Sequence, residues 1–375
     1  EKTKYGEDKK NRRKFFEDVY QLDLLRSKVM NFLLETEKWD FFMIHFTMLD
    51  RVQHWYWKFM DKSHPRYEQN ECSNYIERTY QLMDKIFSEA LQRIPKNSTI
   101  LIMSDHGFGV YIKDINVNMW LKKEGYLFFK EKNIGLLKRF FKKINFSPNK
   151  IINLVFYFRF GFLLKSLSKK TIHKITNQFT INYEDIDYSK SKAYSYGHYG
   201  PIYINKDLIK NKNEYEELRN EIIKKLRLIK DPVYNERLIN EVWKKEELYR
   251  GQKLDMMPDI IPIMQNFSFG ASSILTFMSD KVFSDPITYK TAEHRIEGIF
   301  AICGPNIKKG INRTIDITDI LPTLLYIIDS KIPTDTDGKI LNSIFLKNPK
   351  LDKPKEIYYD VEKEKLKNII QNLNI

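Results

Sequence analysis

The sequence contains few cysteines and no long apolar run. Its 375 residues include two cysteines, Cys72 and Cys303, and neither belongs to a Cys-x-x-Cys pair, so a disulfide framework is excluded. The most apolar stretch, residues 151–164, includes Arg159 and Gly161 and is shorter than the roughly 20 residues that cross a bilayer. We therefore expect no transmembrane helix. Because the first residues are charged and show no secretory signal, we expect a cytoplasmic protein in a reducing compartment.

Acidic residues are also scarce relative to basic ones. The chain has 49 Asp and Glu against 63 Lys and Arg, a net charge of +14. Residues 130–182 carry twelve of the basic residues and one acid, interleaved with Phe, Leu and Ile, which predicts an inserted helical cap. Such a cap can be a solvated surface, a membrane-surface element or an attractor of anionic substrates. Nucleic-acid binding ranks last, because no helix-turn-helix, zinc-finger or RNP-like pattern is present.

The apolar content is sufficient for a large folded core. At 42% hydrophobic and 14% aromatic residues, a disordered or fibrous chain is excluded. Residues 39–47 are nearly continuously apolar, which is typical of a strand buried on both faces of a parallel sheet. Residues 75–91 follow with helical spacing, and residues 99–103 read as a second buried strand. This order predicts an α/β fold with a mostly parallel central sheet flanked by helices on both faces.

The remaining periodicity defines further elements and a domain organisation. Helices are also predicted over residues 15–34, 117–124, 214–228 and 317–328, and buried strands over residues 258–264 and 298–303. The resulting division is a first core part over 1–128, the basic helical cap over 129–182, a second core part with a small peripheral sub-structure over 183–345, and a helical tail over 346–375.

Acid–histidine pairs follow two of the predicted strands. Asp50 and His54 come just past the first strand at a spacing of four, so on a helix they would share one face and could bind one metal ion. Asp105 and His106 come just past the second strand. Because ligands of open α/β sheets bind at the carboxyl ends of strands, both pairs are expected to face one crevice. For either pair taken alone, a helix cap or a polar turn is the alternative.

His294 supplies a third element, predicted to lie in the loop before the strand over 298–303. The other histidines are interpreted differently. His45 lies inside the predicted strand over 39–47 and is interpreted as a core histidine, and His198, in a Tyr- and Gly-rich turn, as a surface or packing residue.

Three motifs therefore occur in order: DRVQH at residues 50–54, SDHGFG at 104–109 and His294-Arg295 leading into Gly298. Together they resemble the alkaline phosphatase superfamily. Within it, the likeness is to the type I phosphodiesterase/nucleotide pyrophosphatase branch and to microbial predicted phosphohydrolase/phosphomutase proteins. Supporting matches are Asn118-x-Trp120-Leu121, Pro258-Asp259-Ile260-Ile261, residues 319–325 (DILPTLL) and Asp337-Gly338.

The resemblance implies a site with two divalent metal ions, zinc or alternatively manganese. By matching position, Asp50, His54 and His294 are expected to bind one metal, and Asp105 with His106 the other. Asp and His ligands suit these metals. Two cations about 3.5–4 Å apart can clamp the attacking and leaving oxygens of an in-line displacement.

The N-terminal end departs from the family pattern. Family members carry an upstream strand that ends in an Asp ligand, with a Thr or Ser nucleophile nearby, and no equivalent precedes Trp39. With Glu1 at the first position, we expect a truncated chain that lacks its nucleophile and one ligand and is catalytically impaired. The sulfatase branch is disfavoured, because neither Cys72 nor Cys303 matches its Cys-x-Pro-x-Arg motif.

The expected function is a metal-dependent phosphohydrolase that cleaves phosphate mono- or diesters by a two-metal mechanism with an upstream Thr or Ser nucleophile. A phosphomutase would use the same phosphorylated intermediate with a different acceptor. The alternative from another class is a non-catalytic basic binding protein. Expected partners are an anionic phosphorylated small molecule or a lipid headgroup, with peripheral membrane contact through the cap and no nucleic acid.

Overall fold

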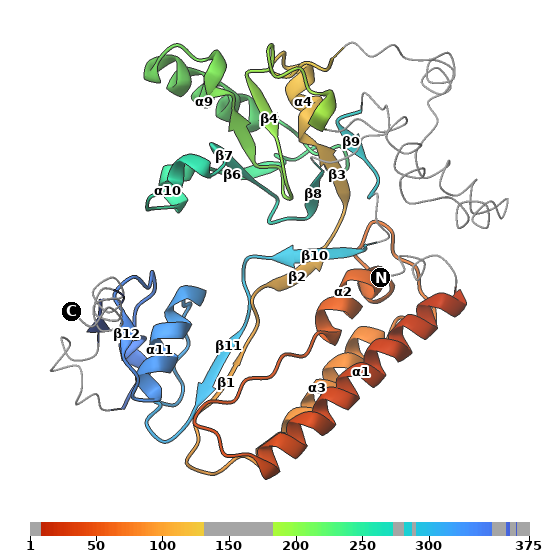
Figure 1. Cartoon of the computed structure of the whole chain (residues 1–375). Coiled ribbons are helices and arrows are strands. Elements are labelled where there is room, and N and C mark those ends of the chain that lie inside the picture. Colours follow the sequence, from red (N-terminus) through yellow and green to blue (C-terminus); the bar gives the residue numbers. More distant parts are fainter. Residues whose placement is uncertain are drawn as a thin grey trace, which may run out of the picture. The chain divides into compact units, whose positions relative to one another are not determined.

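The computed structural model describes residues 9–130, 183–272, 281–286, 290–346, 358–360 and 365 (Figure 1). Nearly all of the predicted basic cap, and most of the predicted tail, lie outside these ranges. The helices of the described part are α1 (Lys9–Thr36), α2 (Met48–Met60), α3 (Tyr75–Leu91), α4 (Val117–Lys123), α9 (Lys212–Leu226), α10 (Lys245–Leu248) and α11 (Ile320–Ile327). None of these helices combines the length and the apolar character needed to cross a lipid bilayer.

The strands are short. They are β1 (Ile100–Met103), β2 (Gly107–Val110), β3 (Lys113–Asn116), β4 (Ala193–Ser195), β5 (Ile202–Ile204), β6 (Ile239–Lys244), β7 (Ile260–Met264), β8 (Phe269–Ser272), β9 (Phe283–Ser284), β10 (Ala292–Arg295), β11 (Phe300–Cys303), β12 (Ile332–Pro333) and β13 (Tyr358–Tyr359). The helices predicted from periodicity are confirmed as α1, α3, α4, α9 and α11, the last preceded by a 3₁₀ turn over Ile317–Asp319.

The mixture of helices and strands is consistent with an α/β fold, but the mostly parallel central sheet is not found among the described strands. These form small sheets of two to four strands, in orders β1-β11, β10-β2, β12-β13, β8-β3-β9 and β4-β5-β7-β6. The pairs β3–β8 and β12–β13 are parallel, whereas β1–β11, β3–β9, β4–β5, β5–β7 and β6–β7 are antiparallel.

The strand predicted over residues 39–47 is wrong. In the structure this segment belongs to no strand, and Phe41 and Met43 are 51% and 75% exposed. His45 is exposed too, so it is not a core histidine. Apolar side chains favour a strand only where a neighbouring strand pairs with the backbone, and such pairing is not encoded in the segment itself.

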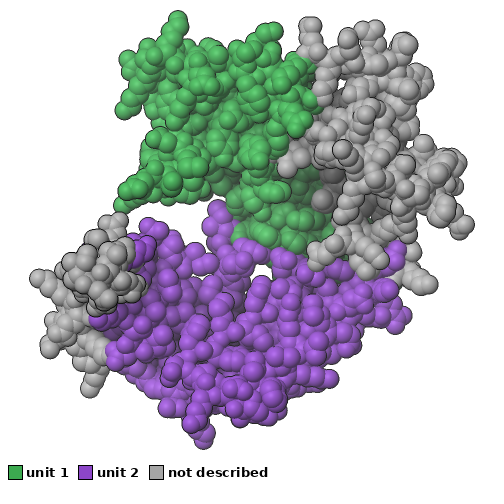
Figure 2. All heavy atoms as spheres, in the orientation of Figure 1, with its two compact units in different colours: residues 1–7, 53–73, 108–295 green, residues 8–52, 74–107, 296–375 purple. Residues whose placement is uncertain are grey.

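The chain divides into two compact units (Figure 2). Unit 1 comprises residues 1–7, 53–73 and 108–295, and unit 2 comprises residues 8–52, 74–107 and 296–375, so the division falls inside α2.

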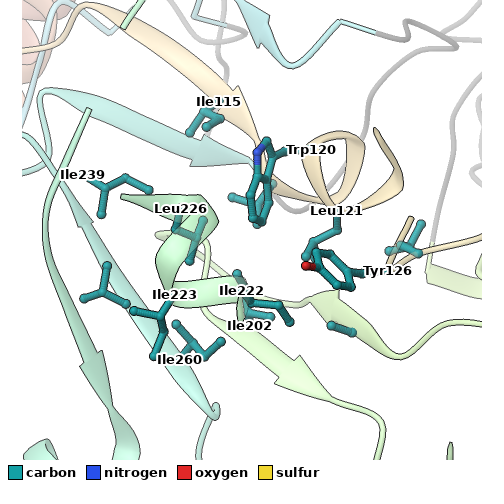
Figure 3. Packing of buried hydrophobic residues seen from close by; sticks show 14 of the residues in the cluster. Ile115, Trp120, Leu121, Tyr126, Ile202, Ile222, Ile223, Leu226, Ile239 and Ile260 are labelled. Atoms are coloured by element: carbon teal, nitrogen blue, oxygen red, sulfur yellow. The ribbon is translucent and has the colours of Figure 1, made fainter. Parts of the chain in front are cut away.

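The core of unit 1 lies between the four-stranded sheet and the helices α4 and α9. Alternate residues of the strands point inward, among them Ile202 and Ile260, both fully buried. They meet Ile222 from α9 and Trp120 from α4 in one cluster, and Figure 3 shows these side chains converging. The period of two along the strands and the 3.6-residue period of α9 thus serve the same core.

In unit 2, α1 packs against α3, with the rings of Phe16 and Tyr75 stacked 4.0 Å apart. The buried face of α1 includes Phe16 and Val19 but also the polar Asp23 and Ser27, whereas Leu25 is exposed. A purely apolar stripe therefore does not describe this helix.

Candidate metal centre

The start of α2 is fixed by α1. The buried carboxylate of Asp23 accepts a hydrogen bond from the Met48 N–H at 3.0 Å, which satisfies one of the free amides at the helix N-terminus. Arg26 donates to both Asp23 and the Thr47 hydroxyl, each at 2.6 Å. Asp50 consequently lies in the first turn of α2, where the helix dipole stabilises a carboxylate.

One turn further along α2 is His54, as the four-residue spacing predicts. The His54 ring is buried, and its Nδ1 lies 2.8 Å from the carbonyl oxygen of Ala292. Because a carbonyl oxygen can only accept, Nδ1 carries a proton, and in the neutral ring the lone pair is then on Nε2. That Nε2 lies 3.0 Å from Nε2 of His294, and Phe108 packs edge-on against both rings at 4.8 and 5.2 Å.

His294 lies within β10, which pairs with β2 (Figure 1), and not in the predicted loop. The next residue, Arg295, fixes this strand: its guanidinium donates to the carbonyl oxygens of Val110 and His294 at 2.6 and 3.0 Å and to the Ser268 hydroxyl at 2.9 Å. The guanidinium lies directly against Gly109, where an added Cβ would come within 2.4 Å of Nε. The second glycine of the SDHGFG motif therefore leaves room for the Arg295 guanidinium, which a larger residue at this position would displace.

Asp50, His54 and His294 form a group that could hold one metal ion, since one ligand atom from each lies within 4.8 Å of the others. The donor set fits zinc or manganese. Two imidazole nitrogens on one tetrahedral zinc are about 3.3 Å apart, so the observed separation needs to open by only a few tenths of an ångström. The hydrogen bond from Nδ1 to Ala292 is the kind of outer contact that orients a metal-binding histidine.

The second predicted pair lies at the end of β1. His106 Nδ1 is 3.1 Å from the Gly107 carbonyl oxygen, and its Nε2 lies 3.6 Å from Asp105 Oδ1 and 3.8 Å from Asp50 Oδ1. Close approach also explains the glycine after His294-Arg295, because a Cβ on Gly298 would lie 2.8 Å from backbone and side-chain oxygens of Ser104.

Glu293, which the sequence interpretation did not single out, is a buried carboxylate beside the centre. Burial by itself raises the pKa of Glu293, but the Lys290 ammonium, the His54 ring and the His294 N–H together hold that pKa below its ordinary value. Its Oε1 lies 3.8 Å from His294 Nε2. The sequence feature that could have identified Glu293 is its position directly before His294, at the start of a motif that contains Arg295 and Gly298.

The other histidines of the described ranges are not members of this group. His198 is exposed, which confirms its interpretation as a surface residue. His64 is buried, accepts from the Arg66 N–H through Nδ1, and therefore donates from Nε2 to the Thr291 carbonyl at 2.9 Å.

The family comparison decides the assignment of the chain. The family model for type I phosphodiesterase/nucleotide pyrophosphatase matches residues 2–271, well over half of the 375 residues. The chain belongs to this family. The resemblance carried by the sequence motifs is therefore confirmed, and the family is one of phosphodiesterase- and pyrophosphatase-type hydrolases. No curated protein and no solved structure matches the chain.

The matched region of this phosphodiesterase-family chain includes Asp50, His54, Asp105 and His106, whereas His294 lies beyond its end. The placement of His294 in the centre therefore depends on geometry: the pairing of β10 with β2 and the 3.0 Å approach to His54.

Proposed function

We propose that the chain is a metal-dependent phosphohydrolase that cleaves phosphate mono- or diesters at a centre of two divalent ions, zinc or manganese. Asp50, His54 and His294 would hold one ion, and Asp105 and His106 would contribute to the other. The observation that supports this most is the pair of Nε2 atoms, 3.0 Å apart, with the Asp50 carboxylate in the same group.

The bound ions would neutralise the phosphoryl oxygens and polarise the phosphorus centre. The protein's own residues prepare for this. Asp23 fixes the start of the helix that carries Asp50 and His54, Ala292 holds a proton on Nδ1 of His54, and Phe108 packs against both imidazole rings. The proposal assigns the attacking hydroxyl to an upstream Thr or Ser, N-terminal to all of the described residues. The net charge of +14 favours an anionic phosphorylated substrate, such as a small phosphate ester or a lipid headgroup.

Zinc and manganese titrations of the metal-free protein test this proposal, with His54→Ala as the variant and His198→Ala as the matched control at an exposed histidine. We expect the wild type and His198→Ala to bind the metal, and His54→Ala to lose at least tenfold in affinity. Hydrolysis of bis(p-nitrophenyl) phosphate, measured in a protein extended at its N-terminus to include the upstream Thr or Ser, should follow the same order. A wild-type protein that takes up neither metal and hydrolyses no ester would contradict the proposal.

A further inference from the structure

Thr291, the residue immediately before β10, uses all of its polar atoms. It is 2% exposed. Its N–H and its hydroxyl both donate to the carbonyl oxygen of His54, at 2.7 and 3.2 Å, and its hydroxyl oxygen accepts from the Lys58 N–H at 3.4 Å. In an α-helix the Lys58 N–H and the His54 carbonyl are partners, and the Thr291 hydroxyl bonds to both of these groups.

Thr291 is itself held from the other side. Its carbonyl oxygen accepts from His64 Nε2 at 2.9 Å and from the Tyr111 N–H at 3.0 Å, just after β2. Because two donors hold this carbonyl, the backbone of Thr291 is fixed by contacts other than those with α2 itself.

Two consecutive residues therefore hold His54 at both of its ends. Thr291 binds the backbone carbonyl of His54, and Ala292 binds the ring at Nδ1. His294 follows on the same strand, and its ring approaches the same histidine. The offset between α2 and β10, and with it the separation of the two Nε2 atoms, is thus set by the contacts of one short segment.

We propose that Thr291 is a positioning residue for the metal centre: its hydroxyl locks the His54 turn of α2 onto β10 so that the two imidazoles converge on one ion. The role of the metal in this inference rests on the proposed function. Its geometry rests on hydrogen bonds observed in the metal-free chain. Outer contacts of this kind typically change metal affinity by about 10- to 100-fold when removed.

Three variants separate positioning from general stability. Thr291→Val removes the hydroxyl at nearly constant shape, and Thr291→Ser retains it. Thr323→Val is the matched control, because Thr323 is also buried, donates to the Asp319 carbonyl at 2.6 Å and accepts from the Leu341 N–H at 3.0 Å. Thr323 lies in α11, whereas His54 lies in α2 and His294 in β10, so the control makes the same chemical change in an element that carries neither histidine.

Affinity for Co²⁺, followed by the visible absorption of the bound ion, should fall about 10- to 100-fold in Thr291→Val. It should return close to the wild-type value in Thr291→Ser and stay unchanged in Thr323→Val. Wild-type affinity in Thr291→Val would overturn the proposal, as would an equal loss in Thr323→Val.

A metal-free measurement distinguishes this inference from the proposed function. In protein labelled with ¹⁵N-histidine, the ring resonances of His54 and His294 should shift in Thr291→Val and not in Thr323→Val. If the wild type binds no metal but these shifts occur, the proposed function fails while Thr291 still positions the rings. If both ring spectra are unchanged in Thr291→Val, the positioning role is refuted whether or not metal binds.

Discussion

Replacing Gly109 by alanine tests the coupling between the SDHGFG motif and Arg295. The new Cβ would lie 2.4, 2.6 and 2.7 Å from Nε, Nη2 and Cζ of the guanidinium, against an ordinary contact of about 3.5–4 Å. The guanidinium must therefore move by about 1 Å. Such a shift stretches its bonds to the Val110 carbonyl and the Ser268 hydroxyl, now 2.6 and 2.9 Å, beyond hydrogen-bonding range.

Hydrogen bonds to a charged group contribute about 1.5–3 kcal/mol each, so the loss of these two gives a destabilisation of about 3–6 kcal/mol for Gly109→Ala. Urea denaturation measures this change. The decisive experiment is a double-mutant cycle in which Gly109→Ala is also made in an Arg295→Ala background. There the added methyl meets no guanidinium, and we expect it to cost less than about 1 kcal/mol. Equal destabilisation in both backgrounds would show that Arg295 is not what excludes a side chain at this position.

Three further outcomes are expected. Burial lowers the pKa of His64 below its ordinary 6.5. The stability that the neutral His64 ring contributes is therefore complete above pH 6.5 and is lost as the pH falls toward the folded-state pKa. His64→Gln should remove this part of the pH dependence of urea unfolding, and an unchanged dependence would count against it. The buried Asn118 amide bonds both the N–H and the carbonyl of Ser195, at 2.7 and 2.9 Å. Asn118→Ala should therefore lower the free energy of unfolding by about 2–4 kcal/mol. A change below about 1 kcal/mol in thermal or urea unfolding would refute this. Chelation by EDTA should lower the melting temperature of metal-loaded wild type and leave that of His54→Ala unaltered, and an equal drop in both proteins would place the bound metal elsewhere.

Local patterns predicted the helices well, because helical periodicity is written within each segment. The α2 arrangement is the clearest case: a spacing of four was enough to place Asp50 and His54 on one face. The buried face of α1 was assigned less well, since Asp23 is buried there to bind the start of α2, a role that an apolar pattern does not encode.

Pairings between distant segments were predicted poorly. The segment over 39–47 has the composition of a buried strand yet pairs with no described strand, and β1 has the antiparallel β11 as its partner in the described sheet. In the candidate centre, the motifs identified His294 as a residue of interest, but its approach to His54 depends on the β2–β10 pair. Thr291 was not identified, because its partners are backbone groups of His54 and Lys58. Every residue has such groups, so a sequence pattern does not show which of them Thr291 contacts.

The contact between Asn118 and β4 also bears on self-association. β4 is a terminal strand of the four-stranded sheet, and terminal strands expose backbone groups onto which a strand of another molecule can add. Here the Asn118 side chain occupies the free N–H and carbonyl of Ser195, while the Ala193 N–H bonds to the Tyr126 carbonyl at 3.2 Å. An amide side chain thus substitutes for a neighbouring strand, and this border of the sheet is closed to the edge-to-edge growth that leads to aggregation.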